Sequence, residues 1–505
     1  MAVIGAIVDL AADPSVIWLG GALALLLVAV MTPAAARGWR ALGRTDEEVS
    51  LRKVHVGEVP RVGGLVVLVG FGAVMLLGLA GTTELSATHE LFSVTPLTGV
   101  LVGALICGLC GLYDDLVGMR ARWKLLLQAA AAAVAVGFGA RWGALEGLLG
   151  PELLWATQGL TAAFLVAGVN AINLMDGLDG LAGGIVAQGF LVILLASVLH
   201  GSAALAVGWI AAAALGAVLG FLLHNRHPAR VFLGDCGAYF LGFLLTALAL
   251  FIEPVRERVA IVRLSIPLLV LALPLIDMGL AVLRRSLRGQ PIFSGDCDHI
   301  HHRLLARGIE HGRVVWMLWA TSAVFAGLAY LNVLGVGGWW TLTGALAATL
   351  GVAILLGYHN LLRRLPAFTG GGTVTIRDRR REMMTMLAAI DSLAALTGES
   401  GPARWRRLAP TLAPIVARLG VPGFEIRAGG EVIAREGEDA AAWGWLSLRL
   451  PGAEGAELRL ALAARLPELQ QSQMVLIERV VALLAGQAAG ARRQAPERGA
   501  ASGGG

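Results

Sequence analysis

The sequence predicts an all-α protein that crosses a membrane many times and carries a small α/β domain at its C-terminal end. Hydrophobic residues make up 57% of the 505 residues, charged residues 15%, and glycine occurs 67 times. This composition is too apolar and too rich in glycine for an ordinary soluble protein. We expect a membrane domain (1–365), a cytosolic α/β domain (366–485) and a disordered tail (486–505).

Eleven apolar runs have the roughly 17 to 25 residues that a helix needs to cross a bilayer. They begin near Ile17, Val62, Leu97, Trp123, Trp155, Gly183, Ala203, Ala238, Ile266, Val314 and Trp340. Lys and Arg alternate between the connections: none precedes Ile17, six lie from Arg37 to Arg61, and none lies from Gly81 to Pro96. Positive residues favour the cytosolic side, so the pattern places the N-terminus outside and the C-terminus in the cytosol. The connection Glu253–Arg263 fits this pattern poorly and is its weakest point.

The net charge of +5 is what basic cytosolic loops facing anionic lipid produce, and no basic segment shows the interleaved aromatics of a nucleic-acid binder. The CxxC pair Cys107 and Cys110 lies in an apolar run, which favours helix packing over zinc. After residue 365 the pattern changes to that of a soluble α/β domain. Helices are expected over 378–397, 404–418 and 467–485, and strands over 425–434, 443–450 and 457–463.

Every unusual polar cluster falls at the predicted cytosolic end of a span. The clusters are Arg52–Gly64, Tyr113–Lys124, Asn170–Gly180, Val231–Gly237 and Gly295–Arg303. Outside connections such as Gly335–Trp339 are short and chemically plain. Ionisable groups are costly in a membrane segment and mark function by default, so the clusters predict one site at the cytosolic face.

The richest cluster repeats amide and carboxylate side chains every three residues: Asn170, Asn173, Asp176 and Asp179. An ideal helix would turn the first and last of them to opposite sides, so all four converge only if the helix tightens or breaks. Gly177 and Gly180 allow such a break. Hard oxygen ligands suit Mg²⁺ held together with substrate phosphates. Helix capping is the structural alternative.

Two further clusters add charge. Asp114 and Asp115 point about 100° apart on a helix, so one can bind a ligand while the other orients a neighbouring group. Lys124 adds a point charge suited to a phosphate. Asp235 lies just before an apolar run, where an N-cap is the structural alternative, and Phe232 could stack on a base.

The last cluster combines ligand types that suggest zinc: Asp296, Cys297, Asp298, His299, His301 and His302. No zinc-ligand spacing matches it, and Arg303 follows directly, so contact with an anion such as pyrophosphate is favoured. All the clusters together lack a Walker A loop and a nucleophile-elbow serine. Their inventory fits metal-assisted phosphoryl transfer, in which the protein positions phosphates and a metal offsets developing charge.

These residues resemble the polyprenyl-phosphate N-acetylhexosamine-1-phosphate transferases, which include the phospho-MurNAc-pentapeptide translocase and the undecaprenyl-phosphate GlcNAc-1-phosphate transferases. Five signatures occur in that family's order over roughly residues 15–360. They are HVGEVPRVGG from His55, the Asp114-Asp115 pair, NAINLMDGLDGLAGG from Asn170, FLGDCG from Phe232, and HIHHR from His299. The family's eleven-span plan agrees with the run count. Ala238 is a departure, because the family commonly has serine there.

The resemblance implies that a polyprenyl phosphate attacks the β-phosphorus of a UDP-sugar, giving polyprenyl-diphospho-sugar and UMP at the cytosolic face of a bacterial inner membrane. Asp235 with Asn173 would hold Mg²⁺, with Mn²⁺ as a substitute. The implied catalytic carboxylates are Asp114, Asp115, Asp176, Asp179 and Asp235. Substrate contacts are implied for Lys124, Asn170, Phe232, His299, His301, His302, Arg303 and His55. A base role for Asp114 or Asp115 is disfavoured, because a phosphate monoester is already largely ionised at neutral pH.

The HIHHR signature resembles the GlcNAc-type branch, so UDP-GlcNAc is the expected donor and UDP-MurNAc-pentapeptide the alternative. The product would start a cell-envelope glycan, such as a cell-wall polymer, lipopolysaccharide or O-antigen. A CDP-alcohol phosphotransferase is disfavoured because its DGxxAR pattern is absent. A transporter is the non-enzyme alternative, although such sites lie near the bilayer midplane between repeated halves. Expected partners are the two substrates, the bilayer and, as an open alternative, a second copy of the chain.

Overall fold

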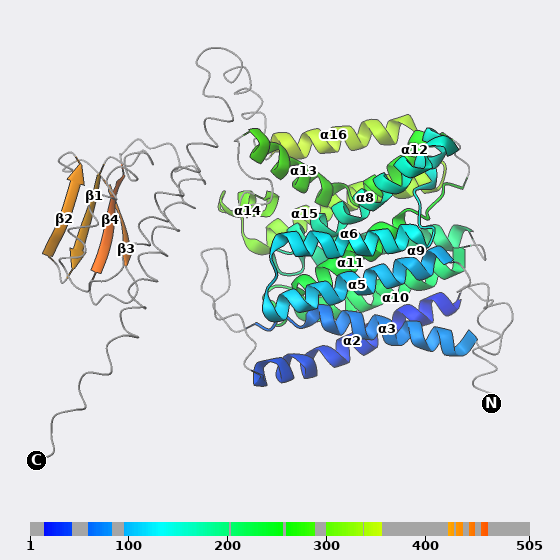
Figure 1. Ribbon diagram of the computed structural model, residues 1–505, viewed down its shortest axis with the longest axis horizontal. Coiled ribbons are helices and arrows are strands. Elements are labelled where there is room, and N and C mark those ends of the chain that lie inside the picture. Colours follow the sequence, from blue (N-terminus) through cyan, green and yellow to red (C-terminus); the bar gives the residue numbers. More distant parts are fainter. Residues whose placement is uncertain are drawn as a thin grey trace, which may run out of the picture. The chain divides into compact units, whose positions relative to one another are not determined.

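The computed structural model describes residues 15–42, 59–82, 95–200, 204–255, 259–287, 299–336 and 338–355, together with four strands between residues 423 and 462. His55 and the segment 296–298 lie outside the described residues, as do the expected C-terminal helices and the tail. The chain divides into two compact units, of which the first holds nearly all of the helical residues and the second holds the strands (Figure 1).

The described part of the first unit is a bundle of helices that lie side by side (Figure 1). Its longer helices are α2 (Ser15–Ala41), α3 (Gly63–Thr82), α5 (Thr95–Val117), α6 (Ala121–Gly137), α8 (Leu154–Met175), α9 (Leu181–His200), α10 (Leu205–Asn225), α11 (Gly234–Ala249), α12 (Ala260–Val270), α13 (Ala272–Leu287), α15 (His311–Val333) and α16 (Trp339–Leu355). Short elements are α7 (Gly143–Leu149), the 3-10 helix η2 (Pro151–Leu153) and α14 (Ile300–Leu305). Helices suit such apolar sequence because they satisfy their own backbone hydrogen bonds in lipid.

The helical unit is that of a multi-pass membrane protein. Six of its described helices are long and apolar enough to cross a bilayer, and α12 with α13 would be a seventh span, bent by 81° at the break between them. A described helix covers each of the eleven apolar runs, but several, such as α3 and α11, are shorter than a full span by this measure. Eleven spans and their orientation therefore stay predictions.

Helix α11 lies at the centre of the bundle. It packs against α5, α8, α3 and α9, and every residue from Cys236 to Ala249 is buried. A helix that is apolar on all sides is a buried helix. The N-terminal end of α11 carries Asp235, so the centre of the bundle presents a carboxylate at one end.

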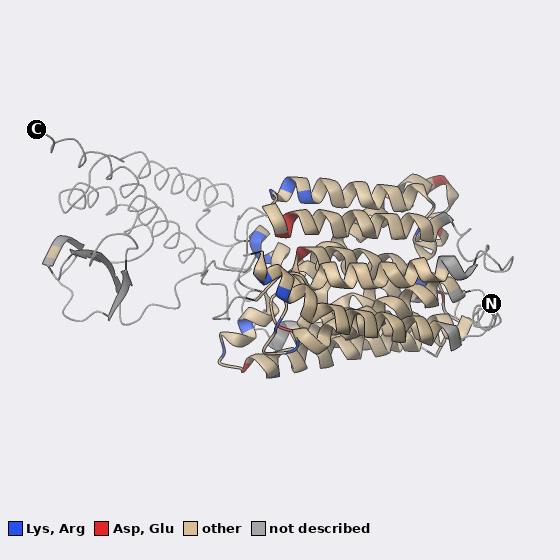
Figure 2. Cartoon of the chain, turned by 90° about the horizontal axis from the view of Figure 1, so that it is seen from below, with Lys and Arg blue, Asp and Glu red and all other residues tan. Residues whose placement is uncertain are grey.

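Most of the Lys and Arg residues of the helical unit gather at one end of the bundle (Figure 2). Arg263 belongs to the connection that fits the charge alternation poorly, and its guanidinium forms an ion pair with Glu253. The connection still carries three Arg and two Glu, a net charge of +1, so it keeps its poor fit to the positive-inside rule.

Glycines let α3 approach the start of α11. A Cβ on Gly64 would lie 2.1 Å from the backbone nitrogen of Gly237, whereas a Cβ on Gly72, in the same helix, would meet nothing within 4 Å. We expect Gly64→Ala to destabilise the protein by about 2 kcal/mol or more, because the backbones must separate. Gly72→Ala should be nearly neutral. Thermal unfolding in detergent measures both; equal midpoints for the two variants would contradict the close approach.

The second unit contains a four-stranded antiparallel sheet. Its strands are β1 (Gly423–Ala428), β2 (Glu431–Gly437), β3 (Gly444–Arg449) and β4 (Ala456–Leu462), in the order β2-β1-β4-β3. The expected strands at 443–450 and 457–463 correspond to β3 and β4. The expected single strand 425–434 is wrong, because β1 and β2 pair there as two strands. Gly429-Gly430 lies between them, and such a pair favours a hairpin turn over a continuous strand.

Candidate active site

Asp115 orients the start of α11. Its carboxylate, at the C-terminal end of α5, accepts the backbone N–H of Asp235 at 3.0 Å and that of Cys236 at 2.9 Å. These N–H groups have no partner within their own helix, so a carboxylate there satisfies them and interacts favourably with the helix dipole. Gly234 has φ +72°, and a Cβ on it would lie 2.6 Å from the Asp115 carboxylate. Asp115 therefore takes the place of an N-cap, a role that the sequence offered to Asp235.

Lys124 joins two carboxylates. Its ammonium forms an ion pair with Asp114 and another with Asp235, where Nζ and Oδ2 are 3.1 Å apart. The same Asp235 oxygen accepts the hydroxyl of Tyr239 at 3.0 Å, and Asp114 accepts the backbone N–H of Met119 at 2.6 Å. Asp235 and Lys124 are each about a quarter exposed, so both can reach a ligand.

Asp114 and Asp115 thus do different things, as their angular separation on a helix predicts. Asp114 holds the Lys124 ammonium, while Asp115 holds the backbone at the start of α11. Neither contact requires the carboxylate to act as a base.

Asp176 adds a fourth carboxylate to the group around α11, after Asp114, Asp115 and Asp235. Helix α8 ends at Met175, and Asp176 begins the turn that leads into α9. Burial raises the pKa of Asp176 well above its ordinary value, and the nearby carboxylates of Asp235 and Asp115 raise it further. Carboxylates that repel each other in this way fit a site that a cation completes.

The break that the glycine spacing predicts is confirmed in this turn. Residues 176–180 leave the helix, and Gly180 has φ +76°. The N–H of Gly180 donates to Oδ1 of Asn225 at 2.9 Å, and the amide of Asn225 donates to the carbonyl of Val231 at 2.8 Å. Asn225 therefore ties the 176–180 turn to the loop that precedes α11.

Phe232 is held by backbone pairing with the segment before α3. Its N–H donates to the carbonyl of Pro60 at 3.0 Å, and its carbonyl accepts the N–H of Gly63 at 3.0 Å. Leu233 accepts the N–H of Gly64 at 2.8 Å. The HVGEVPRVGG and FLGDCG signatures thus meet through their backbones, and Phe232 is half-buried.

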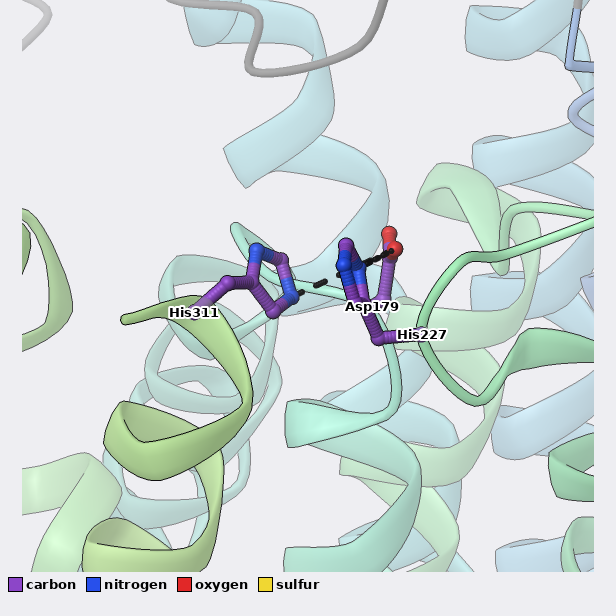
Figure 3. Close-up of side chains that lie close together, drawn as sticks. All are labelled: Asp179, His227 and His311. Carbon is purple, nitrogen blue, oxygen red and sulfur yellow. Dashed lines mark hydrogen bonds and ion pairs between the residues drawn. The ribbon is translucent and has the colours of Figure 1, made fainter.

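Asp179 anchors two histidines that the sequence did not single out (Figure 3). Its buried carboxylate oxygen Oδ2 accepts Nδ1–H of His227 at 2.9 Å and the N–H of Ala229 at 3.0 Å. Nε2 of His311 lies 4.0 Å from the same oxygen, and the two imidazoles stack with centroids 4.2 Å apart. These contacts join the 176–180 turn, the loop before α11 and the start of α15.

The same three side chains are metal-ligand types, with ligand atoms within 4.8 Å of one another. However, the planes of the His227 and His311 rings are only 23° apart. Imidazole lone pairs lie in the ring plane, so nearly parallel stacked rings do not direct them at one ion. The arrangement is that of a carboxylate holding two stacked imidazoles.

Asn170 points into a helix contact instead of the acidic group. Its amide donates to Oε1 of Gln128 in α6 at 2.7 Å and to the carbonyl of Val166 at 2.8 Å. Its contacts therefore indicate a role in packing α8 against α6 and not in substrate binding. Asn173 lies in the last turn of α8, three residues before Asp176.

The histidine cluster divides in two. His299 is buried, and its Nδ1 lies 3.0 Å from Oδ2 of Asp277 in α13. His301 is 1% exposed, and a Cβ on Gly177 would lie 2.2 Å from its Nε2, so this ring packs directly on the 176–180 turn. His302 and Arg303 follow it in α14 and are less buried. Among the described residues of this cluster, His301 makes the contact with the acidic turn.

The structure thus gathers at one end of the bundle most of the residues that the sequence proposed. Those in direct or near contact with the start of α11 are Asp114, Asp115, Lys124, Asp176, Phe232 and Asp235. Sequence reasoning missed Tyr239, although it follows Asp235 by one helical turn and so shares its helix face. It also missed Asp277, for which an acidic residue inside an apolar run was the available signal.

Fold and site together define a multi-pass membrane protein whose helix ends assemble an acidic, phosphate-compatible centre. A family profile described as Glycosyl transferase family 4 matches residues 97–253, which include most of α5 and all of α6, α8 and α11. Most of the acidic residues described above lie in this range.

Curated relatives extend the match. A probable undecaprenyl-phosphate N-acetylglucosaminyl 1-phosphate transferase of Bacillus subtilis is 34% identical over 308 residues, 60% of this chain and 81% of the relative. A decaprenyl-phosphate N-acetylglucosaminephosphotransferase of Mycobacterium tuberculosis is 38% identical over 298 residues, which cover 54% of this chain and 72% of the relative. The undecaprenyl-phosphate alpha-N-acetylglucosaminyl 1-phosphate transferase of Escherichia coli is 28% identical over 297 residues, which cover 56% of this chain and 76% of the relative. The chain belongs to glycosyl transferase family 4, as its signatures predict.

Proposed function

We propose that this protein transfers GlcNAc-1-phosphate from UDP-GlcNAc to undecaprenyl phosphate or a similar polyprenyl phosphate, releasing UMP. The observation that carries the proposal is the convergence of Asp114, Lys124, Asp176 and Asp235 at one end of the bundle. The names of the relatives supply the acceptor and the sugar.

The reaction exchanges one phosphoanhydride for another. An oxygen of the lipid phosphate bonds to the β-phosphorus of the donor, and the bond from that phosphorus to the bridging oxygen breaks, so UMP leaves with the electron pair. The lipid phosphate is largely ionised at neutral pH and needs no strong base. The task of the protein is therefore to position two anions and offset their repulsion.

Lys124 is the group best placed to hold the lipid phosphate. Asp114 and Asp235 already fix its ammonium in position, and an ammonium offers three donors. Phe232 would stack on the uracil, while His301, His302 and Arg303 would contact the diphosphate or the sugar. Asp115 acts indirectly, since its carboxylate holds the α11 backbone that carries Asp235.

A Mg²⁺ ion fits this donor set, because carboxylate and amide oxygens are its preferred protein ligands. Asp235 with Asn173 would hold it beside Asp176, whose pKa is raised first by burial and then by the neighbouring carboxylates, whose repulsion a cation would relieve. The ion would neutralise charge on the phosphates as the anhydride bonds exchange. Mn²⁺ would substitute.

We place the site at the cytosolic face of a bacterial inner membrane, where UDP-sugars are available, and we propose eleven spans. The gathering of basic residues at one end of the bundle supports this orientation (Figure 2). A transporter is not favoured, because the acidic group lies at the helix ends and not at the midplane of the bundle. UDP-MurNAc-pentapeptide is not favoured either, since the names of the three relatives specify N-acetylglucosamine.

A nucleotide-sugar panel tests the proposal. Purified protein in detergent with Mg²⁺ and undecaprenyl phosphate should convert UDP-GlcNAc to UMP and a lipid heavier by one HexNAc-phosphate, as detected by mass spectrometry. Omitting the lipid phosphate or adding EDTA should stop UMP release. A lipid product from another UDP-sugar but none from UDP-GlcNAc would overturn the donor assignment. Sugar flux into proteoliposomes of the same protein, without UMP release, would overturn the enzyme assignment.

A further inference from the structure

Asp277 is an acidic side chain in the helical core that the proposed reaction does not use. It lies in α13, one and a half turns after the 81° bend that separates α12 from α13, and its side chain is fully buried. A carboxylate in such a place is costly unless it is hydrogen-bonded. Its partners therefore indicate why it is there.

Both oxygens of Asp277 bond to the beginning of α14. Oδ1 accepts the backbone N–H of Ile300 at 2.9 Å, and Oδ2 lies 3.0 Å from Nδ1 of His299. Nδ1–H of His299 is the donor that suits this carboxylate oxygen. Ile300 is the first residue of α14, and the residue before it supplies no side-chain cap. The Asp277 carboxylate supplies that cap from a distant helix.

His301 depends on this anchor. Its imidazole is 1% exposed, and within the part of the chain that the structure describes neither ring nitrogen has a hydrogen-bond partner. The ring lies nearly parallel to that of His299, with planes 9° apart and centroids 6.0 Å apart, and it packs on Gly177. Packing and the placement of α14 hold the ring where it is. Burial lowers the pKa of His301 well below its ordinary value, so the ring is neutral.

We propose that Asp277 is a positioning residue for this site: it fixes the start of α14 through His299 and Ile300, and thereby presents the His301 imidazole to the 176–180 turn. Asp277 itself touches no substrate. This inference rests on the proposed function only for its activity readout. It also reassigns His299 from substrate contact to support, because its Nδ1 is bonded to a buried carboxylate.

A double-mutant cycle measures the coupling between Asp277 and His301. Asp277→Leu should lower kcat/KM for UDP-GlcNAc by roughly 10²-fold, as small misplacements of a contact group can, and His301→Ala should have a similar effect. The double variant should be no worse than His301→Ala alone, because Asp277 acts through that ring. Asp277→Asn keeps an acceptor for Ile300 and should lose roughly tenfold in kcat/KM, intermediate between the wild type and Asp277→Leu. Losses that multiply in the double variant would overturn the proposal.

A matched control comes from the same bent helix pair. Ser265 in α12 is buried and accepts the amide of Asn332 at 2.9 Å, at a site remote in sequence from α14. Ser265→Ala removes a buried hydrogen bond comparable to those of Asp277. Its effect on kcat/KM should be small and should multiply with that of His301→Ala. If Ser265→Ala couples to His301→Ala as strongly as Asp277→Leu does, a general loosening of the helix packing explains both effects, and the proposal is overturned.

Carbethoxylation by diethyl pyrocarbonate tests the same contact without turnover. Peptide mass spectrometry should show His301 protected in the wild type and in Ser265→Ala, and labelled roughly tenfold faster in Asp277→Leu, because α14 opens locally. His227 is 44% exposed on its side chain and serves as the internal reference in every variant. Unchanged labelling of His301 in Asp277→Leu would overturn the proposal. An inactive wild type would instead count against the proposed function and leave this result valid.

Discussion

Asp235→Asn is expected to reduce turnover of UDP-GlcNAc by about 10³-fold while the helical unit stays folded. The Asp235 oxygen Oδ2 accepts both the Lys124 ammonium at 3.1 Å and the Tyr239 hydroxyl at 3.0 Å. Asparagine keeps the size of the side chain and one acceptor but removes the charge that pairs with Lys124 and would bind the metal ion. Loss of one preorganised electrostatic group typically costs 10² to 10³ in rate, and this change disturbs two at once.

Three measurements make this prediction sharp. Steady-state assays of UMP release give the loss in turnover, and thermal unfolding should show a midpoint close to that of the wild type. Mn²⁺ binding, followed by electron paramagnetic resonance, should weaken in Asp235→Asn. The control is Glu146→Gln, since within the described residues the carboxylate of Glu146 pairs with Arg141 at 3.5 Å, and both side chains are exposed. If the turnover rate of Asp235→Asn is within threefold of that of the control, Asp235 is not part of the catalytic site.

The second large effect is expected for Asp179→Asn. The buried Oδ2 of Asp179 accepts the N–H of Ala229 at 3.0 Å and Nδ1 of His227 at 2.9 Å. An asparagine oxygen can keep the bond to Ala229, but it leaves the two stacked imidazoles without their carboxylate. The 176–180 turn carries Asp176 and packs against His301, so a displaced turn moves both. We expect a loss of about 10²-fold in kcat/KM.

His227→Gln tests whether Asp179 acts by holding the 176–180 turn in position or by placing its charge beside the two imidazoles. It retains a polar side chain beside Asp179 but removes the ring that stacks on His311. If Asp179 works by holding the turn, His227→Gln should lose less activity than Asp179→Asn, and the double variant should match Asp179→Asn. Wild-type kcat/KM in Asp179→Asn, at an unchanged thermal midpoint, would show that the turn tolerates loss of the charge and would contradict this reading.

Much of the helical arrangement could be predicted because apolar runs and charge alternation are local signals. The gathering of Asp114, Asp176 and Asp235 at one end of the bundle followed from placing every polar cluster at the same predicted face. The break after Met175 agrees with Gly177 and Gly180, which allow it, since all four polar residues of that cluster converge only if the helix tightens or breaks.

The remaining contacts were not predictable, because each joins side chains that are far apart in sequence and carry no mark of their partner. Asp277 and His299 are 22 residues apart, Asp179 and His227 are 48 apart, and Asn170 and Gln128 are 42 apart. A polar residue in an apolar run indicates that its side chain needs a hydrogen-bond partner, but it does not indicate which residue that partner is. The amide of Asn170 therefore suggested a ligand, whereas it bonds to a neighbouring helix.

The fate of the donor β-phosphate tests the central claim most directly. Protein is incubated with undecaprenyl phosphate, Mg²⁺ and UDP-GlcNAc that carries radioactive phosphorus at the β position. The account predicts that the label moves into the lipid fraction in step with release of unlabelled UMP. Label recovered in released UDP, with an unlabelled glycolipid, would show transfer of the sugar without its phosphate and would contradict the account.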